Sequence, residues 1–77
     1  MTKSDQNILD EITAKIAVID REQGNYLARV FQRTSVAPSE YWYCRGLADG
    51  YKSRDIIDGW ELQFVRDTLD QLLWGCS

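Results

Sequence analysis

Apolar residues recur at helical spacing near the start of the chain, and this period constrains the fold more than any other feature. On an α-helix they form one stripe about 100° wide, which is typical of a helix that packs against a core. The residues of this stripe are Ile8, Leu9, Ile12, Ile16 and Ile19. Ser4 can cap the helix, and Gly24 is predicted to end it, because glycine suits the left-handed residue just past a helix.

A second helix is predicted directly after Gly24, with Asn25 as its cap. The residues that would share its inner face are Leu27, Val30, Phe31 and Thr34. The alternative is an α+β fold with a β-hairpin near residues 16–33, because Val and Ile are dense around a turn sequence, QGN. Apolar and polar residues do not alternate strictly there, so we favour the helix.

Pro38 marks the start of a third helix, because proline disfavours helix in the residue before it yet fits the first helical turn. We predict this helix over residues 38–51, followed by a connector at residues 53–57. Asp58 and Glu61 then resemble a capping pair, with a carboxylate at the cap and a glutamate three residues on. They predict the start of a fourth helix.

The fourth helix is predicted to run to about Trp74, where Gly75 stops it. Four helices with short connections are the pattern of a small bundle whose consecutive helices lie roughly antiparallel. No repeat and no long linker divides the chain. We therefore expect an all-α fold, a compact bundle of about four short helices that forms a single domain over residues 1–77.

The chain lacks the residues that catalysis and metal binding use most often. It contains no histidine, the commonest general base and metal ligand. Cys44 and Cys76 fit no metal-binding spacing and are expected to remain thiols in a reducing compartment, with a disulfide between them as the alternative. We therefore expect no enzyme activity, no metal and no cofactor.

Charge and hydropathy limit the classes of partner. Twelve acidic and nine basic residues give a net charge of −3, which disfavours a protein that neutralises many phosphates. A nucleic-acid binder would have to combine the basic residues Arg29, Arg33, Arg45, Lys52 and Arg54. The chain has no run of about 18 apolar residues, and its start, MTKSDQNILDEI, lacks the apolar core of a signal peptide. We expect a cytoplasmic protein without a membrane partner.

The sequence EYWYCRGLADGY, residues 40–51, places three aromatic residues in succession, which span about 200° of a helix. Contact with one neighbouring element can hardly bury all three rings, so we predict a core side of this helix with Tyr41 at its border. We predict Gly46 and Gly50 as positions where another element packs closely. The predicted core side consists of Tyr43, Cys44, Leu47, Ala48 and Tyr51. The residues on the opposite side are Trp42, Arg45 and Asp49.

The fourth helix also carries apolar residues on two sides. Its aliphatic stripe consists of Leu62, Val65, Leu69, Leu72 and Leu73, with Cys76 continuing it. Trp60, Phe64 and Trp74 lie off this stripe, among polar and acidic residues that include Asp67 and Asp70. Either the helix is buried on two sides, with Trp60 and Phe64 packed on the third helix, or these rings are exposed anchors for a partner.

These patterns predict a non-enzymatic protein-binding module. Its predicted partner-binding residues are Trp42, Arg45, Asp49, Trp60, Phe64, Asp67, Asp70 and Trp74. The chain would act as an inhibitor or adaptor on a larger host or effector protein, or would pair with itself as a homodimeric accessory protein. Small size, acidity and missing catalytic groups are also typical of phage or mobile-element proteins that block host defence, such as anti-CRISPR proteins. A nucleic-acid mimic or weak nucleic-acid binder is the alternative.

Overall fold

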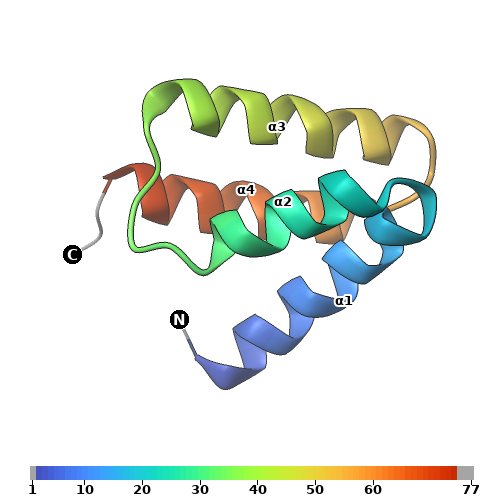
Figure 1. Cartoon of the computed structure of the whole chain (residues 1–77), viewed down its shortest axis with the longest axis horizontal. Helices are drawn as coiled ribbons and strands as arrows, with labels where there is room; N and C mark the ends of the chain where they lie inside the picture. The colour runs from blue at the N-terminus through green and yellow to red at the C-terminus, as the bar shows by residue number, and fades with distance from the viewer. Residues whose placement is uncertain (1, 75–77) are drawn as a thin grey trace.

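Figure 1 shows the computed structural model, which describes residues 2–74. Its helices are α1 (Lys3–Ile19), α2 (Arg21–Phe31), α3 (Pro38–Ser53) and α4 (Gly59–Trp74). Residues 2–74 contain no strand, so the all-α prediction is confirmed and the hairpin near residues 16–33 is wrong. The helical period of the apolar residues in that segment outweighs the β-propensity of its Val and Ile residues.

The helices form two pairs. α1 packs on α2, and α3 packs on α4, with α3 and α4 running side by side in opposite directions (Figure 1). The α1–α2 pair is a V that opens towards the N-terminus of α1. Near the closed end of this V, the Lys15 Nζ lies 2.6 Å from the Glu61 Oε2, and this ion pair joins α1 to α4.

The sequence predicted a break between the first two helices at Gly24. The structure places the break between α1 and α2 at Asp20 instead. The Asp20 N–H donates to the Ile16 carbonyl at 2.8 Å, and the Asp20 Oδ1 accepts the Gln23 N–H at 3.2 Å. One residue thus ends α1 and caps α2. Gly24 lies inside α2, where an added Cβ would come within 2.6 Å of the Ala17 Cβ. Glycine here permits close approach of two helices.

α1 differs from the prediction at both ends. Thr2 rather than Ser4 is its cap, because the Thr2 Oγ1 accepts the Asp5 N–H at 3.1 Å. Ile19 was assigned to the core stripe, but its side chain is 55% exposed. It is the last residue of α1, and the chain turns at Asp20 before another helix covers it.

α3 and α4 begin as predicted. Pro38 occupies the first turn of α3, which ends at Ser53. The Glu61 N–H donates to the Asp58 Oδ1 at 2.7 Å, and the Asp58 N–H donates to the Glu61 Oε1 at 3.0 Å, so the capping pair is confirmed. Gly75, the predicted stop of α4, lies outside the described residues, as does Cys76.

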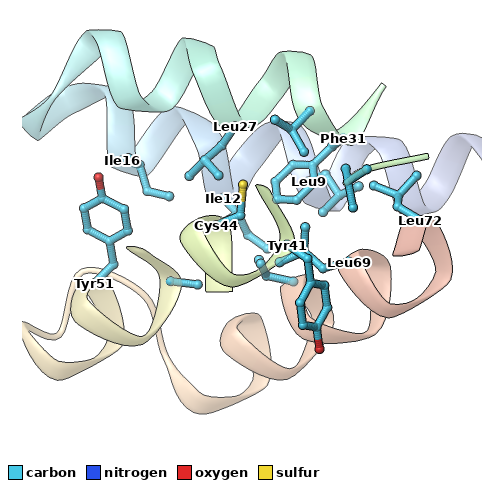
Figure 2. Close-up of a cluster of buried hydrophobic side chains, with 14 of the residues drawn as sticks. Leu9, Ile12, Ile16, Leu27, Phe31, Tyr41, Cys44, Tyr51, Leu69 and Leu72 are labelled. Carbon is cyan, nitrogen blue, oxygen red and sulfur yellow. The ribbon is translucent and has the colours of Figure 1, made fainter. Parts of the chain in front are cut away.

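Residues from all four helices meet in one core (Figure 2). The buried hydrophobic residues are Leu9, Ile12, Ile16, Leu27, Val30, Phe31, Val36, Tyr41, Cys44, Ala48, Tyr51, Ile57, Val65, Leu69 and Leu72. The predicted α4 stripe contributes its central residues to this set, whereas Leu62 and Leu73 at its edge are partly buried. No tryptophan belongs to the core of the described residues.

The core side of α3 is rotated relative to the prediction. Tyr41 is only 5% exposed, whereas Tyr43, predicted to be core, is 53% exposed. α4 covers the side of α3 that carries Tyr41, and Tyr43 instead packs edge-on against Tyr26 of α2, with ring centroids 5.8 Å apart. The close-packing role predicted for Gly46 and Gly50 is wrong, because a Cβ at either position would meet nothing within 4 Å.

Candidate functional site

All three tryptophans of the chain lie on its surface. The exposed fraction is 62% for Trp42, 61% for Trp60 and 79% for Trp74. Phe64 is partly buried against the core and lines a depression together with Asp5 of α1. The interpretation that a second side of α4 buries both Trp60 and Phe64 is therefore wrong for Trp60, and most of the aromatic surface stays open.

Several predicted site residues form a polar cluster that holds α3 against α4. The Tyr41 hydroxyl donates to the Asp70 Oδ1 at 2.5 Å, and the Arg45 Nη1 donates to the Tyr41 hydroxyl oxygen at 3.0 Å. The Arg66 Nη2 donates to the Asp49 Oδ1 at 2.9 Å. Asp70 and burial raise the pKa of Tyr41 above its usual 10.0. The polar groups of Arg45, Asp49 and Asp70 thus form hydrogen bonds within the chain.

Trp42 is held in place by this cluster and is open to solvent on its outer side. Its ring packs edge-on against Tyr41, with centroids 5.0 Å apart and an interplanar angle of 84°. The Arg45 guanidinium carbon lies 5.4 Å from the centroid of the Trp42 ring, within the range of a cation–π contact. An exposed ring fixed by its neighbours loses little rotamer entropy when a partner covers it.

The outer face of α4 carries the remaining predicted residues. Trp60 and Phe64 pack together with centroids 5.5 Å apart and an interplanar angle of 35°. The Asp67 Oδ1 accepts a hydrogen bond from the Gln63 Nε2 at 2.9 Å. Trp74 lies at the far end of α4, about 21 Å from Trp60 along the helix axis at 1.5 Å per residue. The predicted residues therefore form two aromatic surfaces at opposite ends of α4 and not one patch.

A groove runs beside this outer face, where the V of α1 and α2 opens. A depression of about 200 Å³ is lined by Asp5, Phe64, Asp67, Thr68 and Gln71. A second depression, of about 490 Å³, is lined by Gln6, Phe31, Gln32, Arg33, Thr34, Thr68, Gln71 and Leu72. The two depressions adjoin, because Thr68 and Gln71 line both, and together we call them the α1–α4 groove.

Sequence reasoning found one wall of the α1–α4 groove and missed the rest. Phe64 and Asp67 were predicted site residues, but Asp5 and Gln71 were not assigned to the site. No local sequence pattern predicts that Asp5 lies beside α4, because the position of Asp5 depends on the angle between α1 and α2. That angle follows from the turn at Asp20 and from the close helix contact described above.

Three of the five mid-chain basic residues contact other side chains of the chain. Arg33 bonds to Glu40, and this bond, together with the backbone N–H of Ala37, holds the pKa of Glu40 below its usual 4.5. The Arg54 guanidinium carbon lies 5.1 Å from the centroid of the Tyr51 ring. With Arg45 bonded to Tyr41, three of the five residues of the suggested nucleic-acid patch are engaged elsewhere.

The described part of the chain contains no exposed thiol, no metal-binding cluster of side chains and no helix that could cross a membrane. Cys44 is buried in the core, with its Sγ 4.0 Å from the Tyr26 hydroxyl, and burial raises the pKa of this thiol above its usual 9.0, which opposes thiolate formation. Within residues 2–74, no group of three or more acidic or cysteine side chains is placed to hold a metal ion. No helix in that part of the chain is long and apolar enough to cross a membrane.

Comparison with protein-family models, with curated proteins and with solved structures gives no match to this chain.

Proposed function

We propose that this chain is a non-enzymatic protein-binding module that docks its two exposed aromatic surfaces on a larger protein as an inhibitor or adaptor. One observation carries the proposal: the core closes without tryptophan, and Trp42, Trp60 and Trp74 are each more than half exposed. Large exposed rings weaken solubility and add little to folding, whereas tryptophan is enriched in the central contacts of protein interfaces.

The placement of the rings supports a partner of substantial size. Trp60 and Trp74 lie at opposite ends of α4, so a partner that covers both must extend over about 21 Å, which an interface of about 800 Å² per partner can span. Trp42 is already oriented by Tyr41 and Arg45. A small acidic module of this kind suits the role of a phage or mobile-element inhibitor that covers a functional surface of a host protein.

The test compares capture of partner proteins by the wild-type chain and by the Trp42→Ala/Trp60→Ala/Trp74→Ala variant. The control is Val18→Ala/Ile19→Ala, which removes exposed aliphatic side chains from the end of α1. We expect the same partner with wild type and control, and at least about a tenfold loss with the tryptophan variant, because truncating a central aromatic contact costs about 2 kcal/mol or more. Equal capture by all three proteins would contradict the proposal.

Size-exclusion chromatography of the same three proteins separates a larger partner from a second copy of the chain. The proposal expects a monomer whose elution is unchanged by the tryptophan substitutions. A wild-type dimer that the tryptophan variant converts to a monomer would show that the aromatic surface serves self-association, which contradicts the inhibitor or adaptor role.

A further inference from the structure

The geometry points to the α1–α4 groove as the docking site for a peptide segment of the partner that carries a lysine or arginine. This inference rests on the proposed function, because it names the chemistry of the partner. It concerns residues that the tryptophan contacts do not include, chiefly Asp5, Asp67 and the polar rim of the groove.

The narrow end of the groove has the composition of a receptor for a cationic side chain. Asp5, Asp67 and the ring of Phe64 line the same depression of about 200 Å³. Carboxylates attract and accept hydrogen bonds from ammonium or guanidinium groups, and an aromatic face adds cation–π attraction. Trp60, which packs on Phe64, extends this aromatic wall towards solvent.

The two carboxylates at this end are free to take a partner's cation. The ion pairs among residues 2–74 are those of Lys15 with Glu61, Arg33 with Glu40 and Arg66 with Asp49. Neither Asp5 nor Asp67 belongs to one of these pairs. Asp67 accepts a hydrogen bond only from the neutral amide of Gln63 in that part of the chain. Their negative charge is therefore not balanced by a direct ion pair.

The wide end of the groove favours a peptide over a free cation. It combines apolar Phe31 and Leu72 with the amides of Gln6, Gln32 and Gln71, in a depression of about 490 Å³. Arg33 also lines this end, where its charge is paired with Glu40. Apolar surface suits an aliphatic side chain, and amides can bond to the N–H and C=O groups of an extended backbone. Phe64 and Leu72 are about 12 Å apart along α4, which an extended chain of about four residues spans.

Charge favours a basic partner over a second copy of this chain. The net charge of the chain is −3, and the outer side of α4 adds Asp67 beside the groove. Two copies in contact through this face would bring like charges together, which opposes association. A basic segment, in contrast, gains from the field of the unpaired carboxylates as it approaches.

The experiment is a ¹H–¹⁵N correlation NMR titration of the full chain with the blocked peptide acetyl-Leu-Gly-Gly-Arg-amide. The same peptide with citrulline, the neutral isostere of arginine, is the matched control. We expect saturable shifts of the amide signals of Asp5, Phe64, Thr68 and Gln71 with the arginine peptide. Affinity for the citrulline peptide should be lower by about fivefold or more, as expected when a charge-assisted contact is lost.

A pair of double variants tests the carboxylates themselves. Asp5→Asn/Asp67→Asn should weaken binding of the arginine peptide by about fivefold or more. Glu22→Gln/Asp55→Asn changes the net charge by the same amount on other parts of the surface and should leave the affinity near that of wild type. Equal weakening by both double variants would reveal a general charge effect and overturn the proposal. The citrulline comparison uses the unaltered chain, so it holds even if a variant is destabilised.

The outcomes separate this inference from the proposed function. If the arginine peptide shifts no groove signals, or binds no better than the citrulline peptide, the basic docking site is overturned. Tryptophan-dependent capture of a partner would still stand in that case. If the arginine peptide binds as expected but the tryptophan variant captures the same partner as wild type, the groove assignment holds and the role of the tryptophans is wrong.

Discussion

The two faces of α4 carry large apolar side chains in opposite environments. On the inner face Leu69 is fully buried, and Leu72 is 7% exposed. On the outer face Trp60 is 61% exposed and Trp74 is 79% exposed. The aliphatic residues therefore account for most of the folding free energy of this helix, and the exposed rings of Trp60 and Trp74 contribute little to it. A helix that needed only to complete the bundle would carry polar residues on its outer face.

Substitution of one residue on each face gives the largest expected contrast. Leu69→Ala should lower the free energy of unfolding by about 2–5 kcal/mol, because it removes core contacts and leaves a cavity. Trp74→Ala should lower it by about 0.5 kcal/mol or less, because this ring is mostly solvated. Urea unfolding followed by circular dichroism measures both values. Similar losses in the two variants would mean that the outer face supports the fold.

Glycine-to-alanine substitutions test the same contrast on other helices, by adding one methyl group to a helix face that is either packed against a neighbour or open to solvent. Gly24→Ala should destabilise by about 1–3 kcal/mol, because its Cβ would lie 2.6 Å from that of Ala17 and 2.8 Å from Ala17 backbone atoms. Gly46→Ala and Gly50→Ala should each stabilise by about 0.5–1 kcal/mol, because alanine favours the helix and the space is open.

Thermal and urea unfolding of these three glycine variants show the sign of each effect. A stabilising Gly24→Ala would mean that α1 and α2 are farther apart than described. A destabilising Gly46→Ala at high protein concentration, which vanishes on dilution, would instead reveal a second copy packed on the outer side of α3.

Alkaline pH should lower the free energy of unfolding, because ionisable side chains are packed against the core. Burial raises the pKa of Tyr26 and Tyr51 above 10.0 and that of Cys44 above 9.0. The folded state thus favours the protonated forms, and their stabilisation is fully present below the unfolded pKa values. It is lost as pH rises through the higher folded values. The free energy of unfolding, measured in urea at a series of pH values, should fall above about pH 9.

The fall in the free energy of unfolding at alkaline pH should be smaller in a Cys44→Ala variant, because this variant lacks one of the groups whose pKa is raised. A free energy of unfolding that stays level, or rises, from pH 8 to about pH 11 would contradict burial of these groups.

The sequence predicted the helices well where apolar period and capping signals agree. The Asp58 and Glu61 pair fixed the start of α4, and Pro38 fixed that of α3. The break at Asp20 was missed because a glycine at position 24 resembles a helix stop. Its role in close packing depends on Ala17, which lies seven residues earlier in the preceding helix. Local signals cannot distinguish a glycine that ends a helix from one that lets another helix approach.

The candidate site was predictable only in part, for a related reason. Helical period correctly placed Trp42, Trp60 and Trp74 off the core stripes. It could not show that Asp70 bonds to Tyr41, nor that Asp5 lies beside Phe64, since both contacts depend on how separate helices pack.

The most direct test of the central claim is acrylamide quenching of the intrinsic tryptophan fluorescence, since Trp42, Trp60 and Trp74 are the only tryptophans in the chain. The claim is that the fold closes without these rings and leaves them to a partner. We predict a quenching constant for the native chain close to that of the chain unfolded in urea, at every protein concentration. A much lower native constant that persists on dilution would place the rings inside the fold and contradict the account.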